Sequence, residues 1–208
     1  TQNTSIRALA YQLYENNGVI KRENVKDFVK TLTQDERKVL RTLGVKFGRY
    51  HIFLFKLFKP SAVSLRIALW KNFHQKYFDL KPPTFGLNFL NEKKEYSKDF
   101  MLLCGFEKFD NFFVRIDILE RLFMTIMKLR DEKEKDKEIK LIPEMLNLLG
   151  CSKENFLKLI KKMHYYSYTK NDETYFRYVP TRNNKKQFSP KLAKKENPFS
   201  ILKNMNFK

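Results

Sequence analysis

The last third of the chain carries an ordered series of secondary-structure signals, and this order limits what the chain can fold into. Residues 117–130 place apolar side chains on one face of a helix. A short helix is expected over 144–149, and a longer one over 152–164 with Ser152 as its N-cap. Two β-rich segments joined by a polar turn follow within residues 165–179. The expected order is therefore helix, short helix, turn, helix and hairpin.

This order is the pattern of a winged helix-turn-helix domain, although many small α+β domains share parts of it. We predict a fold that is mainly α with short β-strands. A helical N-terminal region is expected over residues 1–110, followed by a winged-helix-like α+β domain over 111–180. Residues 181–208 are basic and rich in asparagine, which predicts a tail with a short terminal helix.

The N-terminal region has clear helix signals. Apolar spacing predicts helices over 4–16 and 22–32, and Lys59-Pro60 opens another that runs to about residue 73. Thr33 and Glu36 form a capping box, because each side chain can satisfy a backbone N–H of the other residue. The chain has only 6 glycines among 208 residues, so few turns need a positive φ and helices should dominate.

Three other segments of the N-terminal region have weaker signals. Residues 45–58 favour a strand, but the apolar run is too continuous for a clear assignment. Residues 84–100 follow a pair of prolines and are expected to be irregular. Residues 101–113 are short and apolar, which fits the end of a helix followed by a strand.

The formal charge of the chain is +19, from 42 Lys and Arg against 23 Asp and Glu. A surplus this large attracts polyanions, of which nucleic acid is the commonest. Two alternatives stay open. An AT-rich genome enriches lysine and asparagine without selection on charge, and a basic surface also suits an anionic membrane.

Nothing in the sequence predicts catalysis or a cofactor. No Gly-x-x-x-x-Gly-Lys-Ser/Thr loop is present to cradle phosphates, and the three histidines are too scattered for a metal site. Asp117 and Glu120 fit helix capping better than acid–base chemistry. Cys151 lies near a helix N-terminus, but the nearest base, His164, is at the far end of the same helix, so a buried turn cysteine is the simpler interpretation.

Cysteine content and hydropathy point to the cytoplasm. Cys104 and Cys151 form neither a CxxC pair nor a disulfide framework, which fits a reducing compartment. No apolar run approaches the ~20 residues of a membrane span. We therefore expect a cytoplasmic protein that does not enter a membrane.

The helix over 152–164 has a lysine face opposite its apolar face. Lys158, Lys161 and Lys162 are three or four residues apart, so they share that face. In a winged helix this helix can enter the major groove. The alternative is an ordinary solvated surface.

Cations and aromatic residues alternate after Gly44. Arginine and lysine can hold phosphates while aromatic rings stack on exposed bases, which suits single-stranded nucleic acid. The phenylalanines of this segment fit a core better. Candidate contacts are therefore Lys46, Arg49, Tyr50 and His51, and the tail adds Arg182, Lys185 and Lys186.

Several blocks of sequence resemble one protein family. The block LGVKFGRYHIFL at 43–54, followed by LFKP at 57–60, resembles the C-terminal region of an alphaproteobacterial superfamily-two (DEAD/DEAH-like) helicase family, similar to the mitochondrial RNA-degradosome helicase. Phe55 departs from this family's pattern, which tends to have proline there. The weaker blocks occur in the expected order, and they are IRALAYQL at 6–13, VRIDILERL at 114–122, PEMLNLLGC at 143–151 and NPFSIL at 197–202.

This resemblance implies an accessory region of an ATP-dependent RNA or DNA helicase. The motor domains, which would hold ATP and Mg²⁺, are absent from these 208 residues and are expected upstream of Thr1. The expected partners are single-stranded RNA or DNA and the helicase motor domains, in cis or in trans. The alternative hypothesis is a free-standing winged-helix adaptor or regulator that binds a protein or duplex DNA.

Overall fold

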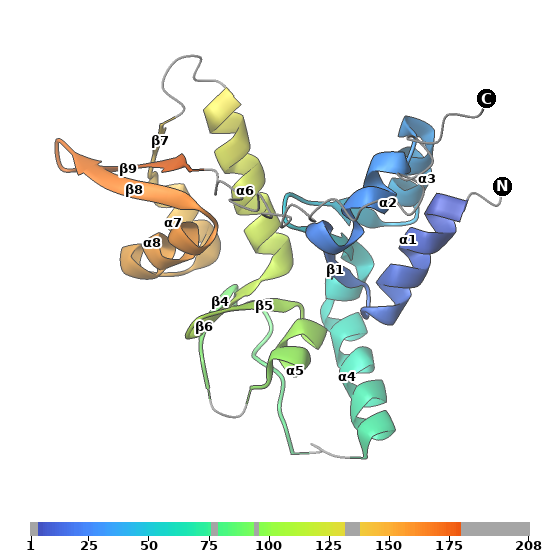
Figure 1. Cartoon of the computed structure of the whole chain (residues 1–208). Helices are drawn as coiled ribbons and strands as arrows, with labels where there is room; N and C mark the ends of the chain where they lie inside the picture. The colour runs from blue at the N-terminus through green and yellow to red at the C-terminus, as the bar shows by residue number, and fades with distance from the viewer. Residues whose placement is uncertain (1–3, 76–78, 94–95, 132–137, 180–208) are drawn as a thin grey trace, which may run out of the picture. The chain divides into compact units, whose positions relative to one another are not determined.

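The computed structural model describes residues 4–75, 79–93, 96–131 and 138–179. These residues form a mixed α/β fold with eight α-helices and three small antiparallel sheets (Figure 1). All of these elements belong to one compact unit. The chain is easiest to follow as three consecutive segments, which we call the first repeat (4–54), the second repeat (55–115) and the third repeat (116–178).

The first repeat begins with a helix and ends with a hairpin. Its sheet has the order β1-β3-β2, so the first strand pairs with the last. The elements are α1 (Thr4–Glu15), β1 (Val19–Lys21), the 3₁₀ helix η1 (Arg22–Val25), α2 (Lys26–Thr31), α3 (Gln34–Thr42), β2 (Val45–Phe47) and β3 (His51–Leu54).

The second repeat has the same plan. Among the residues described, one α-helix lies between its first strand and its hairpin. Its sheet has the order β4-β6-β5. The elements are the 3₁₀ helix η2 (Phe55–Phe58), α4 (Pro60–His74), β4 (Phe89–Asn91), α5 (Lys98–Leu103), β5 (Phe106–Phe109) and β6 (Phe112–Arg115).

The third repeat again runs from a helix to a hairpin, and its sheet has the order β7-β9-β8. Its elements are α6 (Ile116–Asp131), β7 (Ile139–Lys140), α7 (Pro143–Leu149), α8 (Lys153–Lys162), β8 (Tyr165–Lys170) and β9 (Glu173–Tyr178).

The three segments therefore share one topology. In each, a long helix is followed by a strand, then by one or two helices, then by a hairpin whose second strand lies in the middle of the sheet. The central strands begin at His51, Phe112 and Glu173, which are evenly spaced along the chain. The local sequence signals did not predict this repetition.

The residue that joins the last helix to the hairpin has a positive φ in each repeat. These residues are Gly44 (φ 96°), Gly105 (φ 90°) and His164 (φ 64°). At Gly105 a side chain would also meet the ring of Phe58, so both backbone and packing favour glycine there. The left-handed residue ends each helix and turns the chain into the hairpin.

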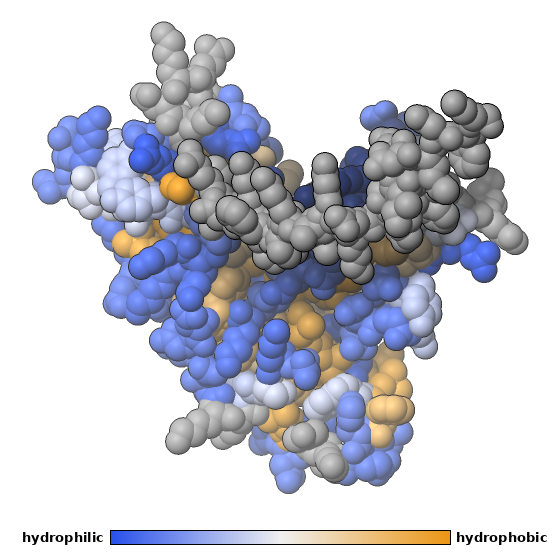
Figure 2. Space-filling model, in the orientation of Figure 1, coloured by the Kyte–Doolittle hydropathy of each residue, from blue (hydrophilic) through white to orange (hydrophobic). Residues whose placement is uncertain are grey.

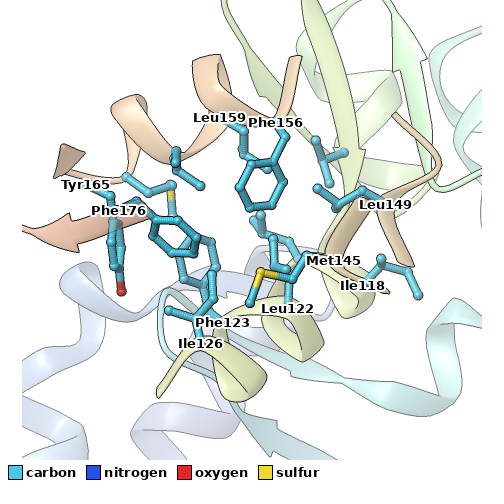
Figure 3. Close-up of a cluster of buried hydrophobic side chains, with 14 of the residues drawn as sticks. Ile118, Leu122, Phe123, Ile126, Met145, Leu149, Phe156, Leu159, Tyr165 and Phe176 are labelled. Atoms are coloured by element: carbon cyan, nitrogen blue, oxygen red, sulfur yellow. The ribbon is translucent and has the colours of Figure 1, made fainter. Parts of the chain in front are cut away.

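Each repeat has its own apolar core. The largest lies mainly in the third repeat, where α6, α7 and α8 pack against the inner face of the sheet around Phe123, Phe156 and Phe176 (Figure 3), and it also includes Phe112 and Val114 of β6. Phe156 and Phe176 meet edge to face with ring centroids 5.9 Å apart. A smaller cluster joins the repeats, and it consists of Val19, Phe53, Phe58 and Ile116.

The predicted helix starts are largely confirmed, whereas the strands of the N-terminal region were underestimated. Thr33 and Glu36 form the expected capping box, and Ser152 accepts a hydrogen bond from the Asn155 N–H. Two of the three sheets, however, lie before residue 116, in the part expected to be helical. The segment 84–100, expected to be irregular, contains β4, which is held by pairing with β6.

Candidate nucleic-acid interface

Helix α8 is amphipathic. Ser152 caps its N-terminus, and Phe156, Leu159 and Ile160 are buried against the core of the third repeat. Its exposed side carries four lysines and one glutamate. The surface around α7, α8 and the β8–β9 hairpin is mostly hydrophilic in the view of Figure 2.

Three of these lysines line a hollow of about 540 Å³ together with the β5–β6 turn. Lys158 Nζ is 2.6 Å from Glu154 Oε1, and Lys162 Nζ is 2.9 Å from Asp110 Oδ1. Lys161 makes no ion pair with any residue that the structure describes. Exposed pairs of this kind contribute only about 0–1 kcal/mol, so a phosphate can replace either carboxylate at little cost.

The corresponding helices of the other repeats are less basic. On α3, Lys38 pairs with Asp35, and the Arg37 guanidinium donates to the Val29 carbonyl oxygen at 2.8 Å. Helix α5 carries one lysine and one aspartate, and three of its six residues are buried. Among the described helices that precede a hairpin, α8 therefore offers the largest surplus of exposed cations.

The predicted contacts between residues 46 and 51 divide into exposed and buried side chains. Lys46 is exposed, with Nζ 5.7 Å from the centroid of the Phe55 ring. Arg49 is exposed and lies 5.9 Å from the ring centroids of both Tyr50 and Tyr178. These two cations can contact a phosphate, because neither makes an ion pair with a described residue.

Tyr50 and His51 point inward. Tyr50 packs edge to face on Phe123 with centroids 4.7 Å apart, and burial raises its pKa above the ordinary value. His51 is only 3% exposed. In this structure His51 is therefore not accessible to nucleic acid, and its role is structural.

His51 belongs to a buried polar cluster that the sequence patterns did not predict. The Glu120 carboxylate accepts hydrogen bonds from the backbone N–H groups of Arg49, Tyr50 (2.9 Å) and His51 (2.7 Å). On the other side of the ring, His51 Nε2 is 3.5 Å from Glu107 Oε2. Lys21 Nζ is 2.7 Å from Glu107 Oε1 and completes a cluster of two cations and two carboxylates when His51 is protonated.

The charges of this cluster support one another. Burial alone lowers the pKa of His51, but the Glu107 and Glu120 carboxylates outweigh burial and raise it above 6.5. Burial alone raises the pKa of Glu107, but His51 and Lys21 outweigh it and lower this pKa. The cluster joins β1 and β3 of the first repeat to β5 and α6.

Asp110 and Asn111, which line the α8 hollow, were also not predicted. They form the tip of the β5–β6 hairpin, about fifty residues before the lysines they meet. No local pattern links such distant positions. The predicted tail contacts Arg182, Lys185 and Lys186 lie outside the described residues.

The described residues contain no group of three or more His, Cys, Asp or Glu side chains arranged to hold a metal ion. Burial raises the pKa of Cys104 to about 12 and that of Cys151 to about 11, which disfavours both thiolates. Among the helices that the structure describes, none combines the length and apolar character needed to cross a membrane.

No protein-family model, curated protein or solved structure matches this chain. The resemblance to the helicase C-terminal region therefore rests on the residue blocks alone.

Proposed function

We propose that this chain is an accessory nucleic-acid-binding module whose third repeat is a winged-helix-like domain. The observation that carries the proposal is the lysine face of α8, which is exposed beside the hairpin β8–β9 and opposite the buried face of the same helix. In this proposal α8 contacts the phosphate backbone, and the driving ATP hydrolysis belongs to a helicase motor in cis or in trans, as the sequence resemblance implies.

The topology of the third repeat supports this assignment. Helix α6, strand β7, helices α7 and α8, and the hairpin β8–β9 follow the order of a winged helix, with β9 between β7 and β8. Gly150 ends α7 in the left-handed conformation and turns the chain toward α8. Under this proposal α8 takes the role of the helix that faces the groove in winged-helix proteins.

The first and second repeats fit a bracing role. Helix α5 buries Phe100, Met101 and Leu103, and Glu107 and Glu120 hold the first repeat through Lys21 and the 48–51 turn. Lys46 on β2 and Arg49 on that turn add exposed charge. We propose that these repeats hold the third repeat in place and add sequence-independent phosphate contacts.

A salt titration of binding tests the proposal. Labelled single-stranded RNA, single-stranded DNA and duplex DNA are titrated with the full chain from low to moderate salt. Each phosphate contact adds roughly −0.7 to the log–log slope for a single strand and roughly −0.9 for a duplex. Replacement of Lys158, Lys161 and Lys162 by alanine should weaken binding and reduce the single-strand slope by about 2.

The matched control removes the same charge elsewhere. Lys26, Lys30 and Lys38 are exposed lysines on α2 and α3, and their joint replacement by alanine should change affinity much less than the α8 variant does. Equal losses in both triple variants would show that only net charge matters. If the unaltered chain does not bind at low salt, the proposal fails.

The helicase part has its own test. The gene upstream of Thr1 should encode a Gly-Lys-Thr phosphate loop and an Asp-Glu pair. A start codon and promoter directly before Thr1 would instead favour a free-standing protein.

A further inference from the structure

The outer face of the third sheet carries a row of tyrosines. Strand residues alternate between faces, and the inner face of this sheet packs Tyr165 and Phe176 into the core. Tyr166, Tyr168 and Tyr175 therefore lie on the opposite face, where Tyr168 is paired in register with Tyr175. Tyr166 is 57% exposed.

The three rings form a continuous stack. The ring centroids of Tyr166 and Tyr168 are 6.3 Å apart with 23° between their planes. Tyr168 and Tyr175 are 6.0 Å apart with an angle of 20°. The rings are thus nearly parallel and offset, and Tyr166 is the exposed end of the stack. An aromatic ring placed on Tyr166 would continue the same arrangement.

Cations surround this stack on the same face. Arg177 is paired in register with Tyr166, and Lys170 follows Tyr168 by two residues on β8. Both are exposed, and neither makes an ion pair with a residue in the described ranges. Arg177 can hold a phosphate beside a base that stacks on Tyr166, and Lys170 can hold a further phosphate of the same strand near the other end of the stack.

Carboxylates lie near the hydroxyl ends of Tyr175 and Tyr168. The Tyr175 hydroxyl donates to Glu173 Oε2 at 2.8 Å, and Glu173 is also paired with Lys140. The Glu138 carboxylate raises the pKa of Tyr168 to about 12, so this ring stays neutral. The Tyr175 hydroxyl is thus held by Glu173, and the Tyr166 ring at the other end of the stack stays exposed.

We propose that Tyr166, Tyr168 and Tyr175 form a stacking platform for unpaired bases of a single-stranded nucleic acid, with Arg177 and Lys170 as its phosphate contacts. The proposal rests on the proposed function and adds a second contact surface, on the face of the sheet away from α8. A duplex hides the faces of its bases, so the platform selects single strands, whereas α8 contacts phosphates of either form.

An abasic oligonucleotide separates stacking from charge. Fluorescence anisotropy is measured with a labelled homopyrimidine DNA of about twelve nucleotides and with an abasic strand of equal phosphate count. The unaltered chain should bind the strand with bases more tightly. The double variant Tyr166→Ala, Tyr168→Ala should lose about five- to a hundredfold in affinity for that strand and almost nothing for the abasic strand.

The control variant is Tyr14→Ala, because Tyr14 is an exposed tyrosine on α1, and it should bind both strands like the unaltered chain. A thermal melt checks that the double variant remains folded, and the single variant Tyr166→Ala, at an exposed position, serves if it does not. Equal affinity of the unaltered chain for the two strands would overturn the platform and leave the proposed function standing. Absence of binding to either strand at low salt would overturn both.

Discussion

Glu120 Oε1 lies 3.0 Å from Nδ1 of the His51 ring and accepts the backbone N–H of the same residue at 2.7 Å. Both residues are almost fully buried. One carboxylate on α6 thus accepts the backbone N–H groups of the 48–51 turn and orients the histidine ring toward Glu107. Because the two residues are far apart in the chain, this contact links the first repeat to the third.

Replacement of Glu120 by alanine should destabilise the protein by roughly 3–5 kcal/mol, because it leaves buried N–H groups and a buried histidine without their partner. Glu120→Gln should cost less, since its amide oxygen can still accept. Urea denaturation gives the free energies of unfolding. Glu144→Ala is the exposed control and should have little effect. A Glu120→Ala variant as stable as the control would show that water replaces the carboxylate.

Gly48→Ala should also be destabilising, because a β-carbon at this position would overlap the Glu120 carboxylate. An overpacked site typically costs about 1–3 kcal/mol. The effect should shrink in a Glu120→Ala background, where the obstructing side chain is gone. A double-mutant cycle measured by urea denaturation tests this. Strictly additive losses would mean that Gly48 is needed for another reason.

Stability should depend on pH through His51. Its pKa is raised in the folded state, so its stabilising contribution is complete below its ordinary value of 6.5 and is lost as pH rises through the folded value. Glu107 has a lowered pKa, so its contribution is present above its ordinary value of 4.5 and is lost as pH falls through the folded value. The cluster should stabilise most between these two limits.

Denaturation midpoints measured from about pH 5 to about pH 9 test this dependence. The unaltered chain should lose stability toward the alkaline end, and His51→Gln should show a flatter profile over that range. Parallel profiles for the two proteins would exclude His51 as the titrating group.

The two thiols should be slow nucleophiles at neutral pH. Burial raises the pKa of Cys151 to about 11 and that of Cys104 to about 12, so few thiolates are present. Iodoacetamide should modify the native chain slowly, with Cys151 ahead of the more buried Cys104, and both quickly in urea. Rapid alkylation of Cys151 in the native protein would revive the idea of a catalytic cysteine.

Local signals predicted the features whose partners are close in sequence. Thr33 and Glu36 cap α3 because they are three residues apart, and Ser152 caps α8 for the same reason. Glu120 fits a capping pattern equally well, yet its carboxylate oxygens accept from the backbone at 49–51. A sequence pattern cannot show that distant backbone groups compete for a side chain. For the same reason the sequence predicted the lysines of the α8 hollow but not Asp110, which comes from another hairpin.

The repeated topology was not predicted because its markers are conformations rather than shared residues. Gly44, Gly105 and His164 all take a positive φ, but only two of them are glycine. The strand β4 is three residues long and has no clear alternation, so only its pairing with β6 defines it. The third repeat was easier to predict because its helices and hairpin are longer and separated by polar turns.

Strand pairing within the described residues never crosses from one repeat to another. The strands of each sheet can therefore begin to pair as soon as their own hairpin has left the ribosome, which favours folding during synthesis from the N-terminus onward. Glu107 and Glu120 emerge later than the 48–51 turn that depends on them. A nascent chain stalled after β3 should consequently hold its first sheet only loosely, and firm closure should await translation of α6.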